Sequence, residues 1–328
     1  MQPSVARNNA AGPAPIDSLA GDVQYYLTLT PRQLPSRYLY DALGSALFEA
    51  ICELPWYRIT AAERGLLARH AREIFAHVDP LSTLVELGPG SGDKLATLVS
   101  AGGTRRDRLT VHLVDVSAAA LDLATRAIAA LDAGDLVIIP HQATYESGLV
   151  DAMAARAGRT LALFLGSNIG NFDPPGADQF LRGVRASLAI GDTLLIGTDL
   201  VKPERDLLLA YDDPLGVTAA FNRNLLVRIN RELGADFDVS AFHHRALWNG
   251  AASRVEMHLV AASRQQVRIP ASLDVTFEEG ETIWTESSYK YRPDDVVQML
   301  ERAGFTRVEQ WIDEKDGFAL TLVAATHP

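Results

Sequence analysis

The sequence predicts an α/β protein in which a parallel, doubly wound sheet is interrupted by an inserted α+β lobe. Between residues 82 and 198, apolar segments of strand length alternate with helical segments, which is the pattern of a parallel sheet covered by helices. The alternation stops near Val201, and helical and extended segments of mixed polarity follow. After Tyr291 a helix and two strand-like segments return. The 328 residues are more than one hydrophobic core usually serves, which agrees with two lobes.

Apolar spacing and Gly or Pro breaks place the individual elements. Helical spacing covers residues 38–78 and is broken at Pro55. Core strands are expected at 82–87, 109–114, 136–140, 160–165 and 193–198, with helices at 118–131 and 174–188. The inserted lobe is expected to hold two helices within 205–233 around a turn at 212–216, and extended segments at 253–261, 266–269 and 277–290. The core then resumes with a helix at 293–303 and strands at 306–311 and 318–325.

These elements predict a division of the chain into five parts. Residues 1–21 are rich in Ala, Pro, Asn and Ser, have no apolar signal-peptide core, and are expected to form a flexible tail. The remaining parts are N-terminal helices that join the inserted lobe (22–64), the core (65–201), the inserted substrate lobe (202–290) and the C-terminal part of the core (291–328).

Composition narrows the class of partner. Lys and Arg number 30 against 41 Asp and Glu, and the formal net charge of −11 disfavours binding to nucleic acid or to anionic lipid. No apolar run is long enough to cross a bilayer. We expect a cytoplasmic protein that binds a free small molecule; the sequence does not indicate an oligomeric state, and a monomer is compatible with it. The single cysteine, Cys52, cannot form an internal disulfide and is expected to be buried and inert.

A glycine cluster follows the first core strand. Gly88, Gly90 and Gly92 do not match the G-x-G-x-x-G spacing of dinucleotide-binding proteins. An acidic residue that leads into G-x-G, here Glu86, is instead typical of methyltransferases that bind S-adenosylmethionine. Taken alone, the cluster is equally consistent with an ordinary turn between a strand and a helix.

A carboxylate at the end of the second strand strengthens the cofactor prediction. Asp115 stands where a side chain can accept hydrogen bonds from both ribose hydroxyls of a nucleoside. The alternative is that Asp115 only precedes a helix that Ser117 caps. Together the two features favour a nucleoside cofactor.

Segments spread over most of the chain resemble one enzyme family. The sequence reads YLYD at 38–41, LGSNIGNF at 165–172 and AYDD at 210–213. Further matching segments are 44–49, 54–57, 197–202, 216–222, 255–257, 280–282, 285–286 and 290–291. In this order they resemble the L-histidine Nα-methyltransferase family of ergothioneine biosynthesis, which makes the trimethylated betaine hercynine. The resemblance implies a Rossmann-like class I methyltransferase core with an inserted substrate lobe, S-adenosylmethionine as cofactor and free histidine as substrate.

The resemblance also implies roles for individual residues. For the cofactor it implies Glu86, Gly88, Gly90, Lys94, Asp115, Thr144 and Tyr145. For the amino-acid pocket it implies Tyr57, Gly166, Asn171, Tyr211, Met257, Glu286 and Ser288. Within that pocket, Asn171 and Tyr211 would hold the α-carboxylate and α-amine, and Glu286 and Ser288 would receive the imidazole. Tyr40 would lie near the amine and help to remove its proton, so Tyr40, Asn171 and Tyr211 are the catalytic candidates.

Each of these residues also has an ordinary structural interpretation. Tyr211 is consistent with a helix end, Asn171 with a turn, Met257 with core packing and Glu286 with a solvated surface position. Only their occurrence together, in the family's order, favours a site. His243 and His244 have no Cys or carboxylate partners at metal spacing, so no metal site is predicted.

Three positions depart from the family pattern. Arg58 and Ile59 follow the pocket tyrosine where the family often has Tyr-Pro, so either the substrate differs or Arg58 faces solvent. Thr144 stands where the family tends to place an acid near the adenine. Ser287 precedes Ser288 and leaves the choice of pocket hydroxyl open. The alternatives to histidine methylation are therefore the same chemistry on another amino acid or amine, and a non-catalytic binding protein on the same fold.

Overall fold

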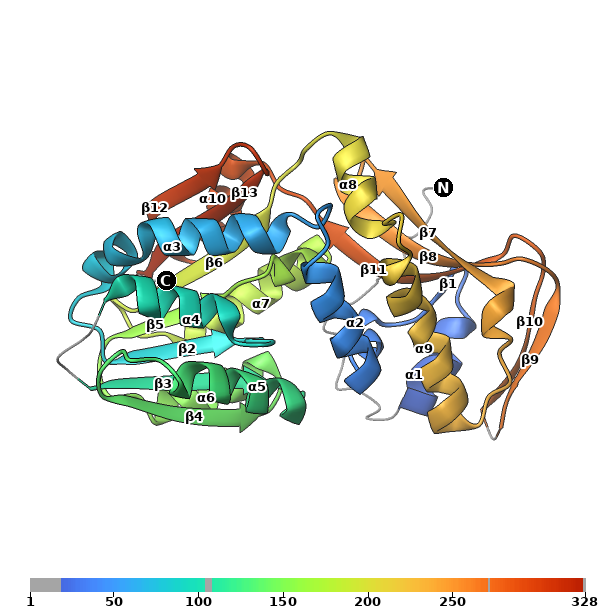
Figure 1. Ribbon diagram of the computed structural model, residues 1–328, viewed down its shortest axis with the longest axis horizontal. Helices are drawn as coiled ribbons and strands as arrows, with labels where there is room; N and C mark the ends of the chain where they lie inside the picture. The colour runs from blue at the N-terminus through green and yellow to red at the C-terminus, as the bar shows by residue number, and fades with distance from the viewer. Residues whose placement is uncertain (1–18, 104–107, 271, 327–328) are drawn as a thin grey trace. The chain divides into compact units, whose positions relative to one another are not determined.

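The computed structural model describes residues 19–103, 108–270 and 272–326, and these residues form two compact units. Unit 1 contains the described residues up to Arg58, then Gly170–Gly176 and Lys202–Lys290. Unit 2 contains Ile59–Ile169, Ala177–Val201 and the described residues from Tyr291 onward. Figure 1 shows the elements of both units, which are described one at a time below.

Unit 2 is built on a seven-stranded sheet in the order β12-β13-β6-β5-β2-β3-β4. Its strands are β2 (Thr83–Leu87), β3 (Leu109–Asp115), β4 (Leu136–Gln142), β5 (Thr160–Phe164), β6 (Thr193–Asp199), β12 (Phe305–Asp313) and β13 (Phe318–Ala325). Strands β2 to β6 pair in parallel, whereas β13 runs antiparallel to both β6 and β12. A single reversed strand in an otherwise parallel sheet of this order is the class I methyltransferase topology, so the predicted fold class is confirmed.

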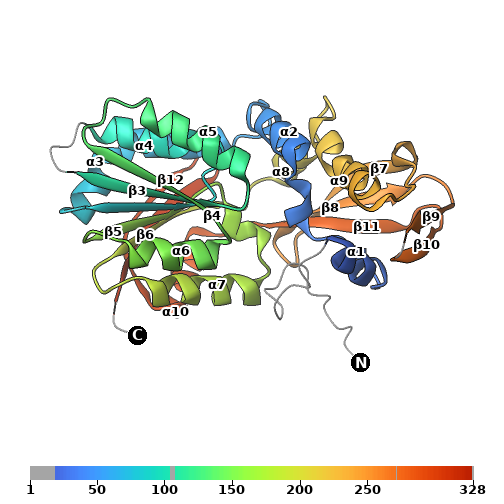
Figure 2. The same ribbon diagram turned by 90° about the horizontal axis from the view of Figure 1, so that it is seen from below.

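Helices cover both faces of this sheet. In Figure 2, α3 (Ile59–Val78), α4 (Asp93–Gly102) and α5 (Ala118–Ala129) lie along one face. The opposite face carries α6 (Tyr145–Ala154), α7 (Pro174–Ser187) and α10 (Pro293–Arg302). Because neither face meets water, β2, β5 and β6 are buried throughout, and their sequences are continuous apolar runs instead of alternating patterns.

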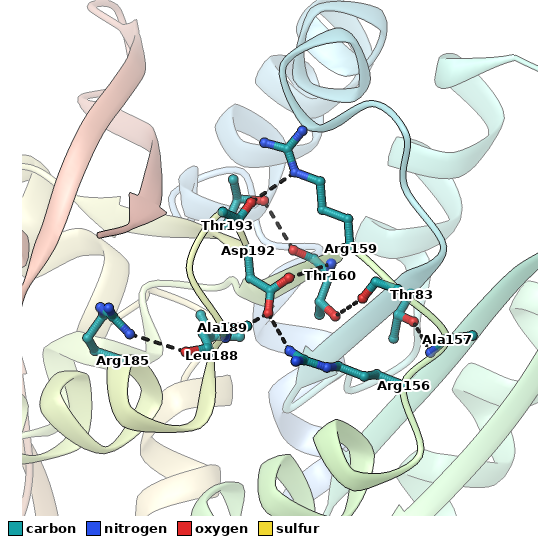
Figure 3. Close-up of polar contacts among 12 residues, drawn as sticks. Thr83, Arg156, Ala157, Arg159, Thr160, Arg185, Leu188, Ala189, Asp192 and Thr193 are labelled. Atoms are coloured by element: carbon teal, nitrogen blue, oxygen red, sulfur yellow. Dashed lines mark hydrogen bonds and ion pairs between the residues drawn. The ribbon is translucent and has the colours of Figure 1, made fainter. Parts of the chain in front are cut away.

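A buried carboxylate fixes the amino ends of two neighbouring strands. Asp192, which immediately precedes β6, accepts hydrogen bonds from the backbone nitrogens of Thr160 and Ala189, at 2.9 and 2.8 Å, and from Arg156 at 2.7 Å (Figure 3). Three hydrogen bonds to a buried carboxylate offset much of the cost of removing its charge from water. Ligands of parallel sheets bind at the carboxyl ends of the strands, so this network at the amino ends is structural.

Unit 1 contains a four-stranded sheet in the order β1-β11-β8-β7 and a separate β9-β10 hairpin. The strands are β1 (Arg32–Gln33), β7 (Phe242–Asn249), β8 (Arg254–Ala261), β9 (Gln265–Ile269), β10 (Leu273–Phe277) and β11 (Thr282–Tyr289). The helices are α1 (Leu19–Leu27), α2 (Ala42–Cys52), α8 (Glu204–Tyr211) and α9 (Val217–Leu233), and short 3₁₀ turns are η1 (Ser36–Leu39) and η3 (Val239–Ala241). A further 3₁₀ turn, η2 (Asn168–Asn171), has two residues assigned to each unit. The apolar side of α9, with Phe221, Leu225 and Ile229, is buried.

The structure corrects several boundaries. Residues 19–21, predicted as tail, begin helix α1, and the rest of the predicted tail lies outside the described residues. Helix α3 belongs wholly to unit 2, so the expected boundary after residue 64 falls instead after Arg58. Residues 170–176 group with unit 1 and not with the core, whereas the 202–290 segment does group with unit 1. Cys52 is half-buried at the end of α2, not fully buried as expected.

No helix in the part of the chain that the structure describes is both long and apolar enough to cross a membrane.

Candidate active site

The turn after β2 requires glycine. Gly88, Gly90 and Gly92 all have positive φ, at 74°, 56° and 83°, a conformation that other residues adopt only with strain. A Cβ on Gly88 would lie 2.9 Å from the Tyr145 hydroxyl, and one on Gly92 would lie 2.7 Å from the Cα of Ala124. The turn therefore keeps its backbone bare at the carboxyl end of β2, where a ligand can approach closely.

Two carboxyl groups with unusual environments flank this turn. Burial raises the pKa of Glu86 to about 8, and its Oε2 has no hydrogen-bond partner among the residues that the structure describes. Asp115 ends β3, burial raises its pKa, and its Oδ1 accepts a hydrogen bond from the Ser117 backbone nitrogen at 2.8 Å. Ser117 also caps α5, as the alternative interpretation of this segment expected, and the ribose-binding role of Asp115 stays a prediction. Asp115 retains a second carboxylate oxygen for a ligand.

Lys94 lies one residue into α4 and is held by a residue that the sequence did not single out. Its Nζ is 3.1 Å from Oε2 of Glu63, whose side chain is completely buried. Both Glu63 oxygens also accept the backbone N–H of Gly166, each at 2.9 Å. Gly166, predicted for the amino-acid pocket, therefore groups with the cofactor residues of unit 2. The one signal for Glu63 in the sequence is an acid beside the apolar positions Ala62 and Leu66 of a helix.

Thr144 and Tyr145 differ in what they offer a ligand. The Thr144 side chain is exposed and caps α6 by accepting the backbone N–H of Ser147 at 3.4 Å. The Tyr145 ring packs edge-on against Phe164 and Phe180, with centroids 5.4 and 6.1 Å away, and burial raises the pKa of its phenol. Tyr145 thus forms a rigid apolar wall next to Gly88, whereas Thr144 has a hydroxyl that is already engaged.

These residues fit S-adenosylmethionine. The glycine turn has no side chains, so a ligand can lie close to its backbone. The Asp115 oxygen that does not bond Ser117 can accept a hydrogen bond from a ribose hydroxyl, and Oε2 of Glu86 can accept one from an ammonium group of the ligand. Lys94 provides a positive charge for a carboxylate. The chemistry such a ligand supplies is an electrophilic methyl group on a sulfonium.

The predicted pocket residues Tyr211 and Ser288 meet in unit 1 around a buried lysine. The Tyr211 hydroxyl donates to Ser288 Oγ at 2.8 Å, and Lys290 Nζ donates to the Tyr211 oxygen at 2.7 Å and to Ser288 Oγ at 2.8 Å. The Lys290 ammonium also lies 4.6 Å from the centroid of the Tyr211 ring. Lys290 has no predicted role, because a lysine after a strand is ordinarily a surface residue; in the structure it is 2 % exposed.

Glu286 lies on the same side of β11 as Ser288. It is 6 % exposed, and burial raises its pKa to about 7, an effect that the Lys290 charge partly offsets. Met257 of β8 pairs directly with Glu286 across the antiparallel ladder, so the two side chains share a face. Ser287 points to the other face, where its hydroxyl is buried without a partner among the described residues. This settles which of the two serines stands beside Tyr211.

Aromatic side chains extend from this cluster through unit 1. The Tyr57 ring packs edge-on against Tyr211 at a centroid distance of 6.2 Å and against Phe48 at 6.2 Å. Tyr40 packs against Phe48 and Phe221, both at 5.5 Å. Tyr40, Tyr57 and Tyr211 thus belong to one aromatic array, and their place in an amino-acid pocket stays a prediction.

Asn171 and Arg58 are polar residues that are not part of this aromatic array. Asn171 is half-buried at the end of η2 in unit 1, and its side chain has no hydrogen bond within the described ranges. Arg58 is exposed at the end of its segment of unit 1, and Ile59 is buried where α3 begins. The structure therefore gives Arg58 the solvent-facing position that was one of its two predicted outcomes.

One group of possible metal ligands lies outside the sequence prediction. Atoms of Glu73, His77 and Glu309 lie within 4.8 Å of one another on the surface of unit 2. Oε2 of Glu73 is already engaged, at 3.1 Å by His70 and at 3.0 Å by the indole N–H of Trp311. The group is thereby explained as a polar surface network.

The comparison with known proteins decides the family. The sequence profile of the family described as "Histidine-specific methyltransferase, SAM-dependent" matches residues 19–325. The chain belongs to this family. Among the relatives of the chain, the histidine N-alpha-methyltransferase of Mycobacterium tuberculosis is 44% identical over 94% of the chain and 95% of its own length. The enzyme of the same name from Mycolicibacterium smegmatis is 42% identical over 96% and 97%.

The family also has more distant relatives whose names record another substrate. An L-tryptophan methyltransferase of Psilocybe serbica is 28% identical over 90% of this chain and 89% of its own. S-adenosylmethionine dependence is therefore a property of the family to which the chain belongs, whereas the choice of amino acid has to be argued from the pocket.

Proposed function

We propose that this enzyme transfers methyl groups from S-adenosylmethionine to the α-amine of free L-histidine, three times in succession, and so makes the betaine hercynine for ergothioneine biosynthesis. The observation that carries the proposal is the polar face of β11, where a buried carboxylate, a hydroxyl and a buried ammonium follow one another at Glu286, Ser288 and Lys290. Strand alternation directs the Glu286 and Ser288 side chains to one side, and Lys290, which follows the strand, donates to Ser288 Oγ.

The carboxylate and the hydroxyl match a neutral imidazole. Glu286 has no hydrogen bond to its side chain within the described residues and can accept a ring N–H. Ser288 Oγ already accepts from Tyr211 and Lys290, so its own proton is left to donate. A neutral imidazole has one donor and one acceptor nitrogen, which is the complement of this pair. An apolar side chain would leave Glu286 buried and unpaired, which disfavours it as a substrate.

The ammonium end of the face matches the α-carboxylate of an amino acid. Lys290 Nζ donates to the Tyr211 oxygen at 2.7 Å and to Ser288 Oγ at 2.8 Å, and a carboxylate that reaches this buried ammonium would accept a charge-assisted hydrogen bond. Nζ lies within 3 Å of the Ser288 hydroxyl. The carboxylate and the side-chain ring of the bound molecule therefore have to lie close together, as they do in a free amino acid. Peptides and larger amines fit this arrangement less well.

Catalysis then depends on presenting an uncharged amine in line with the methyl group. Holding two reacting atoms aligned supplies several kcal/mol of the barrier, roughly 7–11 kcal/mol in the best cases. The uncharged amide of Asn171 binds an amine without fixing its charge. Tyr40 is the candidate relay, whose oxygen accepts the amine proton while its own hydroxyl proton passes on to solvent. Mono- and dimethylated products keep a nitrogen lone pair once deprotonated, and the trimethylated betaine has none. Reaction therefore ends at three methyl groups.

A panel of free amino acids tests the proposal. The purified enzyme is incubated with S-adenosylmethionine and each amino acid in turn, and products are weighed by mass spectrometry. Histidine should be methylated fastest and become heavier by one, two and finally three methyl groups. A faster reaction with tryptophan or another amino acid would replace histidine as substrate. Cofactor binding without turnover of any acceptor would instead support a non-catalytic role.

A further inference from the structure

Glu63 is a buried charge at an unusual place in the fold. It lies in the first turns of α3 on the side that packs against the sheet, between the buried residues Ala62 and Leu66. Its carboxylate has three contacts, namely Lys94 Nζ at 3.1 Å and the Gly166 N–H at 2.9 Å to each oxygen. A Cβ on Gly197 would lie 2.0 Å from Oε1, so any residue larger than glycine at this position of β6 would displace the carboxylate.

These contacts join the parts of unit 2 that surround the cofactor residues. Lys94 follows the glycine turn after β2, Gly166 follows β5, and Gly197 lies near the end of β6. The carboxyl ends of neighbouring parallel strands form the ligand-binding edge of such a sheet. A buried ion pair contributes little net stability, because desolvation offsets most of its attraction. Its consequence here is geometric, since it fixes the position of Lys94 and of a backbone segment.

The charged groups around Lys94 indicate which neighbouring oxygen its position leaves available to a ligand. Burial and the charges of Glu63 and Asp115 raise the pKa of Glu86, and the charge of Lys94 lowers it. With Glu63 as its 3.1 Å partner, Lys94 leaves Oε2 of Glu86 unpartnered. Lys94 already attracts Glu86, so without Glu63 we expect the ammonium to move toward the Glu86 oxygen that a cationic ligand needs.

We propose that Glu63 is a positioning residue for S-adenosylmethionine, which holds the Lys94 ammonium and the Gly166 backbone in place and keeps Glu86 free for the ligand. This inference rests on the cofactor of the proposed function and not on the identity of the methyl acceptor.

The test is a double-mutant cycle between Glu63 and Lys94, read by calorimetric titration with S-adenosylmethionine and with S-adenosylhomocysteine. Glu63→Gln retains an oxygen that accepts from Gly166 and loses the charge that holds Lys94. We expect it to weaken binding of both ligands about tenfold. In a Lys94→Gln background the same change should weaken binding no further, because its partner is already gone.

Matched controls separate positioning from general damage. Glu73→Gln removes an exposed carboxylate from the same helix and should leave cofactor affinity unchanged. Glu63→Asp keeps the charge with a shorter reach and should bind more tightly than Glu63→Gln; it also completes the cycle if the glutamine variant does not fold. Wild-type affinity in Glu63→Gln, or an equal loss with and without Lys94, would overturn the inference. Failure of the wild-type chain to bind either ligand would instead refute the proposed function.

Discussion

Replacing Glu286 by glutamine is the most direct test of substrate recognition. The change removes a negative charge and keeps the volume of a side chain that is 6 % exposed. A hydrogen bond to a charged group contributes about 1.5–3 kcal/mol and a neutral one about 0.5–1.5 kcal/mol. The expected loss of histidine affinity is therefore about 1–2 kcal/mol, or roughly 5- to 30-fold. Glu286→Ala should lose more, because the imidazole N–H then has no acceptor.

The same substitution should stabilise the ligand-free protein. Burial raises the pKa of Glu286 from an ordinary value of 4.5 to about 7. The folded protein thus binds a proton that the unfolded chain releases, and stability falls as pH rises from 4.5 to 7. At about 1.36 kcal/mol per pKa unit, the buried charge costs about 3 kcal/mol above pH 7. Glutamine escapes this penalty, so Glu286→Gln should unfold at a higher temperature at pH 8.

Both expectations are measured on the same two proteins. Calorimetric titration with histidine gives affinity, and titration with S-adenosylmethionine is the control that should not change. The histidine affinity of the wild type should rise as the pH increases through about 7, where Glu286 ionises, and the ratio of wild-type to variant affinity should follow the same curve. Glu278→Gln, which removes an exposed carboxylate of unit 1, controls for a change in net charge. Equal histidine affinity in the wild type and Glu286→Gln would refute the reasoning.

Three further predictions concern neighbouring or buried groups. Ser288→Ala should weaken histidine binding about tenfold in titrations, whereas Ser287→Ala, on the other face of β11, should leave it unchanged; similar losses would contradict the assigned strand face. Lys290→Met should raise the KM for histidine at least tenfold but spare binding of histamine, which lacks the carboxylate; parallel losses for both would remove Lys290 from carboxylate recognition. Burial and the neighbouring His141 lower the pKa of His112 from 6.5 to about 4. The free energy of unfolding therefore has its full value above pH 6.5, where His112 is neutral in both states, and falls on acidification, by about 2 kcal/mol at pH 5. Urea unfolding of wild type and His112→Leu at pH 7.5 and 5 measures this, and an undiminished pH dependence in the variant would exclude His112 as its source.

The core of the fold could be predicted because its signals are local. Strand β13 was expected at 318–325 and has those bounds, since it is buried on both faces and reads as one apolar run. Strand β7 was missed, because within Phe242–Asn249 only Phe242 and Ala246 are buried and the polar residues 243–245 lie between them. Helix α6 was missed as well; its short sequence has only Gly148, Leu149 and Ala152 buried.

Some residues of the candidate site could likewise be predicted from the sequence, and others could not. Gly88 and Asp115 stand beside strand ends that the sequence already marks, so their placement follows from the order of elements. Glu63 and Lys290 could not be found, because their importance comes from burial against residues 103 and 79 positions away in the chain. A charged side chain in a polar-looking segment gives no sign of such partners. The role of Asn171 in binding the amino acid, which the resemblance implies, stays a prediction.

The position of β13 has a consequence for how the protein is made. This strand lies inside the sheet of unit 2, hydrogen-bonded to β6 on one side and β12 on the other, yet it follows every segment of unit 1 in the chain. During synthesis, all of unit 1 leaves the ribosome before the sheet of unit 2 can close. A nascent chain that stops short of Phe318 would present an unpaired edge on β6, and such edges invite pairing with other chains.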